Sequence, residues 1–296
     1  MAHIKSKTML ALRRIGNCLS LGGRFRIPQK LLWYGLGQID ATVPISDFDG
    51  DLAVNLRLSE HMQRRIFWLG YYNLLLVPFL KNFLRPGMTF IDVGANIGEI
   101  SLVAAKLVGP SGRVIAFEPI DRIAGELQMN AQRNQLEQIS VVRVGLSNGH
   151  GARLPIYSSC GQGSPGDEHS GLGSLYGAAT GSSPLQYIDV TTLDTWIDEH
   201  PMNRVDMIKI DIEGAELPCL QGARRTLQRF KPVLIVELQD TTAITAGYRA
   251  TDILDLLSGL GYSFYRFEAQ GPVSFSRTAK LKSNQNILCT AANPSS

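Results

Sequence analysis

The stretch FIDVGANIGEISLVAAK, residues 90–106, decides the fold. It begins as an apolar, strand-like run, and from Ile100 onward apolar residues recur every three or four positions, as on one face of a helix. Gly94 and Gly98 lie in the turn between the two patterns. A strand that leads through a glycine-containing turn into a helix is the basic unit of a parallel α/β sheet. Ligands bind at such turns because the helix N-terminus offers free backbone N–H groups.

The same alternation of strand and helix patterns continues along the chain. The strand-like runs are residues 89–93, 113–117, 140–144, 206–210 and 233–238. Each is apolar on both faces, and helical periods separate them. Because crossovers between parallel strands are right-handed, we expect a doubly wound, mostly parallel sheet with helices on both sides.

Other segments extend this pattern at both ends. A helical period runs over residues 59–83, and another over residues 217–230. Near the C-terminus, residues 262–269 and 284–291 are strand-like. We expect these last two strands to form a closing hairpin at the edge of the sheet.

A domain division is predicted at residue 58. Residues 1–58 are a basic leader and a short strand segment, in which the Asp-Gly of DFDGD signals a hairpin. Residues 59–296 form the α/β domain. Within that domain, residues 158–183 contain seven Gly and seven Ser and are expected to form a long loop. Loops of that length inside a compact domain are usually either functional or disordered.

Composition limits the partners of the protein. The hydrophobic content of 44% is ordinary for a folded protein, and a formal charge of +3 does not imply nucleic-acid binding. Residues 1–30 carry seven Lys and Arg and no acid, which suits either a solvated chain end or peripheral contact with an anionic membrane. No run of about 18 apolar residues occurs, and the four cysteines lack zinc-site spacing. These features predict a cytoplasmic protein with reduced thiols.

The spacing of the first loop separates two kinds of nucleotide ligand. A dinucleotide fingerprint is G-x-G-x-x-G, whereas this loop reads D-x-G-x-x-x-G from Asp92. A carboxylate there repels a diphosphate and suits the ammonium and sulfonium groups of S-adenosylmethionine. Glu118 ends the next strand, the position from which an acid accepts hydrogen bonds from ribose hydroxyls. The alternative is that Gly94 and Gly98 only permit close packing and that Glu118 faces solvent.

Four motifs carry a resemblance to a known family. They are GMTFIDVGANIGEISL, VIAFEP, LDTW and DMIKIDIEGAELPCLQGA, within residues 60–240. In combination they closely resemble the FkbM-type family of S-adenosylmethionine-dependent methyltransferases. The resemblance implies a Rossmann-like, seven-stranded sheet with an antiparallel last strand. It also implies O-methylation of a hydroxyl on a glycan, a glycolipid or a secondary metabolite.

The same resemblance implies which residues bind the methyl donor. They are Asp92, Gly94, Asn96 and Gly98 in the methionine-binding loop, Glu118 at the ribose, and Ser147 and Asn148 near the adenine. Glu99 replaces a position that is frequently aromatic in the family.

The fourth strand supplies the catalytic candidates. Asp211 lies at its carboxyl end and Glu213 two residues on, so one can act as the base while the other orients the acceptor hydroxyl. The two carboxylates also suit a divalent cation such as Mg²⁺. The alternative is structural, with Asp211 capping the next helix and Glu213 and Glu216 complementing its dipole. His169, in the long loop, is more typical of an exposed loop histidine than of a base.

Two other classes of protein compete with an active methyltransferase. The first is a binding or scaffold protein that keeps the methyltransferase fold without turnover. The intact set of Asp92, Glu118 and Asp211 argues against it, and the departure at Glu99 leaves it open. The second is a dinucleotide-dependent dehydrogenase, which the loop spacing disfavours.

Overall fold

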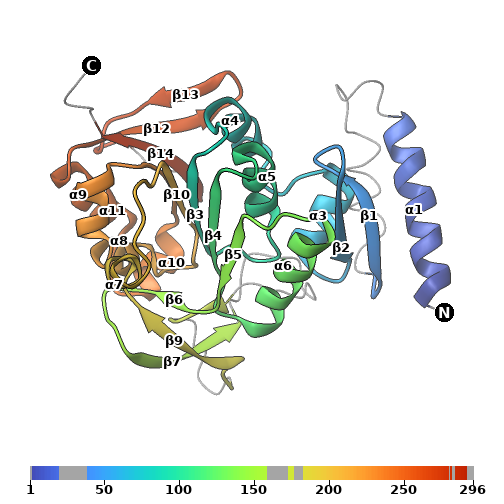
Figure 1. Ribbon diagram of the computed structural model, residues 1–296, viewed down its shortest axis with the longest axis horizontal. Helices are drawn as coiled ribbons and strands as arrows, with labels where there is room; N and C mark the ends of the chain where they lie inside the picture. The colour runs from blue at the N-terminus through green and yellow to red at the C-terminus, as the bar shows by residue number, and fades with distance from the viewer. Residues whose placement is uncertain are drawn as a thin grey trace.

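The structure, a computed structural model, describes residues 2–19, 39–158, 173–176, 183–279, 281 and 284–291. These residues form one large sheet, a small four-stranded sheet and a two-stranded hairpin (Figure 1). The strands of the large sheet are ordered β13-β12-β14-β11-β10-β3-β4-β5.

Five neighbouring strands of the large sheet are parallel. They are β3 (Thr89–Val93), β4 (Arg113–Phe117), β5 (Ile139–Val142), β10 (Met207–Ile210) and β11 (Val233–Leu238). They confirm the predicted strands to within two residues at each end. The order reverses at β3, with β4 and β5 on one side and β10 and β11 on the other. This reversal leaves a crevice at the carboxyl ends of β3 and β10.

The last strand lies inside the sheet. β14 (Gln285–Ala291) runs antiparallel between β11 and β12 (Tyr262–Glu268). The expected closing hairpin is therefore only partly right: β12 and β14 do pair, but β13 (Gly271–Ser274) forms the edge. The strands from β5 to β12 match the implied seven-stranded sheet with an antiparallel last strand, and β13 adds an eighth.

Helices cover both faces because each central strand buries side chains on both. Phe90 and Met207 belong to one core, and the residues next to them, Ile91 and Ile208, belong to the other. The first face is covered by α4 (Leu76–Phe83), α5 (Glu99–Val108) and α6 (Asp121–Arg133). The second is covered by α7 (Leu193–Glu199), α8 (Glu216–Gln221), α9 (Arg224–Phe230) and α11 (Ala250–Gly259). The short α10 (Asp240–Thr245) follows β11.

Two predicted helices are broken in the structure. The period over residues 59–83 is α3 (His61–Leu69) and α4, because α3 ends at Gly70 with a φ of 87° that a helix does not allow. The period over residues 217–230 is divided into α8 and α9 around Gly222. A regular spacing of apolar residues survives both breaks because the helices on either side pack on the same core.

The N-terminal part of the described chain lies at one end of the molecule, with α1 (Ala2–Leu19) outermost (Figure 1). The hairpin predicted at DFDGD is confirmed as β1 (Thr42–Phe48) and β2 (Leu52–Arg57). Arg13 of α1 pairs with Asp47 and donates from Nε to the Phe67 carbonyl oxygen at 2.7 Å. One cation of the basic leader is thus committed to the fold.

A second, smaller sheet borders the long loop, where the sequence predicts no strands. It consists of β6 (Gly145–Leu146), β9 (Gln186–Thr191), β7 (Ala152–Ser158) and β8 (Gly173–Ser174), in that order. Of the loop predicted over residues 158–183, only Ser158, residues 173–176 and Ser183 are described, and His169 lies outside the described residues.

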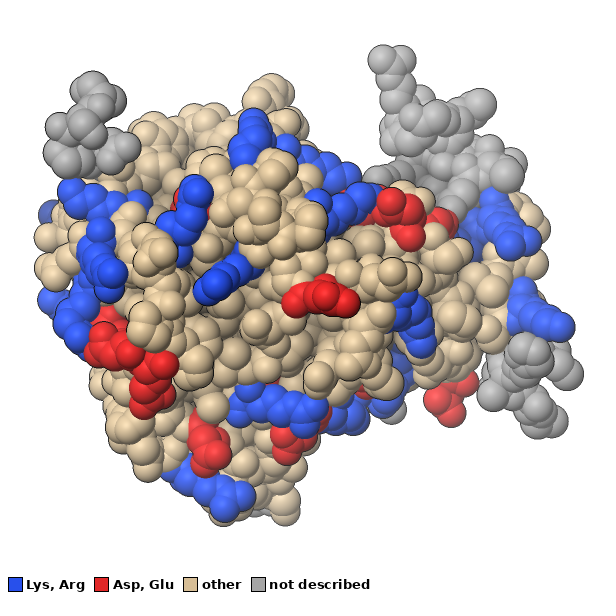
Figure 2. Space-filling view, viewed as in Figure 1, with Lys and Arg blue, Asp and Glu red and all other residues tan. Residues whose placement is uncertain are grey.

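Charged side chains are mixed over the molecular surface. On the face in Figure 2, Lys and Arg side chains alternate with Asp and Glu among uncharged residues. Of the helices that the structure describes, none is long and apolar enough to cross a membrane. Membrane contact through residues 1–30 stays a prediction.

Gly94 provides a test of how tightly β3 and β10 are joined. Its φ is +78°, and a Cβ atom there would lie 2.0 Å from the Asp211 carbonyl oxygen. We expect Gly94→Ala to lower the free energy of unfolding by about 3 kcal/mol, from the left-handed conformation and the overpacking together. Urea denaturation measures this change.

The matched control is Gly261→Ala. Gly261 also has a positive φ, +84°, but no atom lies within 4 Å of the added Cβ. It should cost only about 1 kcal/mol. Equal losses in the two variants would show that the approach of Asp211 to Gly94 does not constrain the sheet.

Candidate active site

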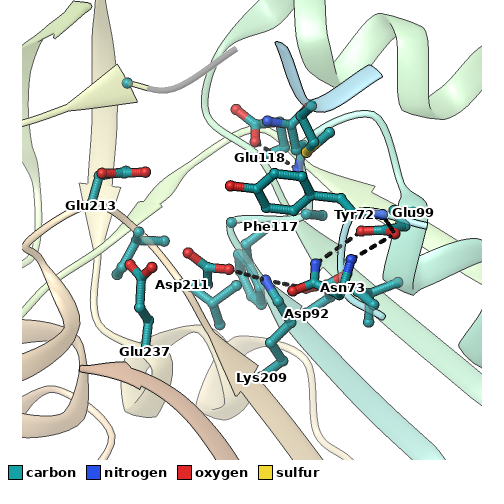
Figure 3. A pocket seen from close by; sticks show the side chains of 18 of the residues that line it. Tyr72, Asn73, Asp92, Glu99, Phe117, Glu118, Lys209, Asp211, Glu213 and Glu237 are labelled. Carbon is teal, nitrogen blue, oxygen red and sulfur yellow. Dashed lines mark hydrogen bonds and ion pairs between the residues drawn. The ribbon is translucent and has the colours of Figure 1, made fainter. Parts of the chain in front are cut away.

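A cavity of about 780 Å³ lies at the carboxyl ends of the central strands. Asp92, Glu118, Asp211 and Glu237 line it from β3, β4, β10 and β11 (Figure 3). The segment between α3 and α4 lines another wall, as do the first residues of β14 and part of the long loop at Gly173. The cavity thus joins the predicted strand-end acids to segments that were not predicted to reach them.

Backbone hydrogen bonds to the end of β4 hold the β3–α5 loop in place. The N–H groups of Gly94 and Ala95 both donate to the Phe117 carbonyl oxygen at 3.0 Å. Gly94 leaves room for the Asp211 carbonyl oxygen, and a Cβ on Gly98 would lie 2.2 Å from Leu127 Cδ1. The packing alternative for both glycines is therefore supported, and Gly98 does not line the cavity.

Glu118 is buried at the end of β4, so the solvent-facing alternative is wrong. Its Oε2 accepts from the Asn96 N–H and its Oε1 from the Ile120 N–H, each at 3.0 Å. Burial raises the pKa of the Glu118 carboxyl to about 7, against the lowering effect of those two N–H groups. Each oxygen keeps a second lone pair, so Glu118 can still accept hydrogen bonds from a ligand.

The Asp92 side chain does not project from the edge of the loop, because it is fully buried. Oδ2 accepts from the Ser101 hydroxyl at 2.7 Å, and Oδ1 lies 3.5 Å from Lys209 Nζ. The same Nζ lies 3.3 Å from Asp211 Oδ2, so a single buried ammonium bridges the ends of β3 and β10. The two strands bring these groups together because Asp92 and Lys209 are register partners.

The bridge shifts the pKa values of Lys209 and Asp92. Burial lowers the pKa of the Lys209 ammonium, but the charges of Asp211 and Asp92 outweigh it and raise that pKa. Burial raises the pKa of the Asp92 carboxyl, and Lys209 and the Ser101 hydroxyl oppose this. Lys209 therefore stays protonated. Its positive charge offsets the negative charge of Asp92, which the sequence analysis matched to a cationic ligand.

Glu99 anchors the segment between α3 and α4, a role that sequence reasoning missed. Its Oε1 accepts from the Tyr72 N–H at 2.5 Å and from the Asn73 N–H at 3.1 Å, and its Oε2 from Asn73 Nδ2 at 2.9 Å. Tyr72 is thereby held against the cavity. The available signal was an acid at the first position of α5, followed by a mostly apolar helix.

The acids after β10 divide into two groups. Asp211 and Glu213 line the cavity, and the Asp211 side chain is 23% exposed. Glu216 turns back instead, accepting from the Ile212 N–H at 2.9 Å, the Gly214 N–H at 3.0 Å and the Tyr248 hydroxyl at 3.0 Å. The structural role proposed for these acids thus belongs to Glu216.

Ser147 and Asn148 do not reach the cavity, whose lining from this segment is Val144, Gly145 and Leu146. Asn148 Nδ2 donates to Gln221 Oε1 at 2.9 Å, outside the site. The geometry therefore gives no support to their predicted place near an adenine ring.

No metal centre is evident in the part of the chain that the structure describes. Within it, no three His, Cys, Asp or Glu side chains are grouped so as to hold a metal ion. Asp211 and Glu213 remain candidates for acid–base chemistry.

The large sheet is Rossmann-like, with an antiparallel last strand and a cavity at its switch point. The family model "Methyltransferase FkbM domain" matches residues 92–264. Because that match covers more than half of the chain, the chain belongs to the FkbM methyltransferase family.

Two relatives are about one-quarter identical to this chain in sequence. AMB antimetabolite synthetase AmbE of Pseudomonas aeruginosa is 26% identical over 81% of this chain, which spans only 12% of that protein. The 2-O-methyltransferase NoeI of Sinorhizobium fredii is 25% identical, over 58% of this chain and 72% of NoeI.

Two solved structures that are similar to this chain have TM-scores below 0.5. Methyltransferase FkbM from Methylobacillus flagellatus KT has a TM-score of 0.43 and 20% identity, over 76% of this chain and 52% of that one. An S-adenosylmethionine-dependent O-methyltransferase from Thermotoga maritima has a TM-score of 0.40 and 13% identity, over 76% of this chain and 68% of that one.

Replacing Lys209 tests the buried bridge. Lys209→Met leaves Asp92 buried without its cation, so the free energy of unfolding should fall by about 3–5 kcal/mol. Adding Asp92→Asn to this variant should restore a large part of the loss, since the uncompensated charge is then gone. Urea denaturation of both single variants and the double variant gives the coupling energy.

The control is Lys7→Met, at an exposed position of α1, which should change stability by less than about 0.5 kcal/mol. Additive effects of Lys209→Met and Asp92→Asn would contradict the bridge.

The raised pKa of Glu118 predicts a pH dependence of stability. The folded protein holds this proton more tightly than the unfolded chain, whose carboxyl has the ordinary pKa of 4.5. The contribution is fully present below pH 4.5 and is lost as the pH rises through about 7. Relative to Glu118→Gln, the wild type should lose about 3 kcal/mol across that window.

Urea denaturation of both proteins from below pH 4.5 to above pH 7 measures this difference. The other buried acids are common to both proteins and cancel. Parallel stability curves would show that Glu118 ionises normally.

Proposed function

We propose that this protein is an S-adenosylmethionine-dependent O-methyltransferase that acts on a hydroxyl of a glycan, a glycolipid or a secondary metabolite. The observation that carries the proposal is the position of Glu118. It is buried at the end of β4, lines a cavity of about 780 Å³ at the switch point of the sheet, and keeps lone pairs free toward it. Membership of the FkbM family and the similarity to a 2-O-methyltransferase support the type of reaction.

The lining residues fit the parts of the donor. Glu118 would accept from the ribose hydroxyls, and Phe117, Ile120 and Leu146 offer an apolar surface for the adenine. The methionine end would lie between the β3–α5 loop and the first residues of α5, which both line the cavity. When bound, S-adenosylmethionine supplies a methyl group activated by its sulfonium. In this proposal Phe117, Ile120 and Leu146 contact the adenine, and Ser147 and Asn148 do not.

Asp92 enters the proposal in a changed role. Lys209 already offsets its charge, and the Ser101 hydroxyl occupies its other oxygen. Asp92 therefore supports the loop and fixes Lys209, and the attraction for a cationic donor comes from Asp211, the more exposed end of the bridge.

Asp211 is the group placed to accept the proton of the acceptor hydroxyl. Its partly exposed carboxylate lies in the cavity and is oriented by Lys209 at 3.3 Å. A positioned base typically contributes about 10²–10⁴-fold to the rate, and alignment of the reactants about 7–11 kcal/mol. Glu213, on the same loop, would help to orient the acceptor.

Two variants separate binding from turnover. Glu118→Gln should weaken the binding of S-adenosylhomocysteine about tenfold or more, because a carboxylate that accepts from ribose is replaced by an amide. Asp211→Asn should bind it nearly as well as the wild type but transfer about 100-fold less labelled methyl to an extract of the source cells. Calorimetry measures the binding, and scintillation counting measures the transfer.

Wild-type protein that binds S-adenosylhomocysteine but transfers no methyl group would favour the rival binding or scaffold protein. NAD binding in its place would favour a dehydrogenase and would overturn the proposal.

A further inference from the structure

The cavity has two chemically different ends, set by the strand order. Asp92 and Glu118 lie at β3 and β4, where the proposed donor binds, and their oxygens accept hydrogen bonds or pair with a cation. Beyond Asp211 the sheet continues to β11 and β14, which contribute Glu237 and Asn286 to the lining. This second end is where an acceptor has room beside the donor.

Glu237 is buried without a hydrogen-bond partner for one of its oxygens. Its side chain is 8% exposed, and Oε2 has no partner among the residues that the structure describes. It points into the cavity near Asp211 and Glu213 (Figure 3). Burial raises the pKa of its carboxyl strongly, and the charges of Asp211 and Glu213 add to this effect. Leaving a buried acceptor unsatisfied is costly, which indicates that a ligand supplies the missing donor.

Asn286 provides a second acceptor next to Glu237. The two residues are register partners in the β11–β14 ladder, so their side chains lie on the same face of the sheet. Asn286 Oδ1 is also buried without a partner in the described part of the chain. A ligand group with several N–H or O–H bonds would satisfy both neighbouring acceptors when Glu237 is ionised.

The charge balance of this end selects a cation. Asp211 and Glu237 bring two carboxylates to this end, and Asp92 is a third acid that shares Lys209 with Asp211. The guanidinium of Arg65 lies over the Tyr72 ring, 5.2 Å from its centroid. Even with Arg65 counted, these acids outnumber the cations once Glu237 ionises beside a bound cation.

Aromatic side chains enclose the same end. Tyr72 and Phe267 line the cavity there, and aromatic faces attract cations. Burial, followed by the charges of Asp211 and Glu237, raises the pKa of the Tyr72 hydroxyl to about 12, so Tyr72 adds no negative charge of its own.

We propose that this end is a subsite for a protonated amine, and that the acceptor is an amino alcohol: an amino sugar or a hydroxylated amino-acid derivative. Its ammonium would donate to Glu237 Oε2 and Asn286 Oδ1, while its hydroxyl faces Asp211. The inference rests on the proposed function, because it defines which hydroxyl compounds the enzyme accepts. A neutral polyol would satisfy the two acceptors but leave the negative charge unbalanced.

Matched pairs of probes test the charge preference. The full-length protein, saturated with S-adenosylhomocysteine, is titrated with D-glucosamine and N-acetyl-D-glucosamine, and with L-threoninol and N-acetyl-L-threoninol, by ligand-observed NMR. In at least one pair the amine should bind about tenfold more tightly than its acetylated counterpart, as expected for a hydrogen bond to a charged group. Glu237→Gln should abolish this preference.

Glu199→Gln is the matched control, since it removes a carboxylate at an exposed position at the end of α7, and it should keep the preference. If Glu237→Gln does not fold, Glu213→Gln, at a partly exposed position, should reduce the preference instead. Binding of S-adenosylhomocysteine by each variant reports folding.

Four outcomes would overturn the proposal: tighter or equal binding of the acetylated probes, a preference that survives Glu237→Gln, no binding of any amine at millimolar concentration, or Mg²⁺ binding that Glu237→Gln removes. If the wild type fails to bind S-adenosylhomocysteine, the proposed function fails. If it binds but shows no amine preference, only the subsite fails.

Discussion

The ammonium of Lys209, buried between Asp92 and Asp211, is the constraint on which the site depends. Taking Lys209 and Asp92 out of water costs several kcal/mol for each, and only close pairing offsets this cost. The ends of β3 and β10 must therefore stay in register. This register also places the Asp211 carbonyl oxygen against Gly94. The positions of Asp92, Lys209 and Asp211 in the crevice are thus set together.

This arrangement distributes charge unevenly across the cavity. On the β3 side, Asp92 is neutralised by Lys209, and Glu118 is held by backbone N–H groups. On the β11 side, Glu237 has an unpartnered oxygen and carboxylates as neighbours. On the β3 side the acids thus have partners within the chain, whereas on the β11 side one buried oxygen has none among the described residues. The proposed donor and the proposed amine subsite correspond to these two ends of a single cavity.

Much of the candidate site was predictable, but individual roles were not. Asp211 and Glu118 were predicted from their places at strand ends, since parallel strands bring those ends to one edge. Glu99 was noted only as a departure from a family pattern, yet it fixes the wall that carries Tyr72. Ser147 shows the reverse, because a position in sequence after a strand does not say whether the chain turns toward the cavity or away from it.

The sequence by itself determined the alternation of strands and helices, the loop from Asp92 and the class of enzyme, because these depend on local periodicity and on short motifs. The tertiary structure decided where β14 is inserted, and so brought Asn286 beside Glu237. It also decided that Lys209 is shared by two acids. Both depend on pairing between segments distant in the chain, which no local pattern encodes.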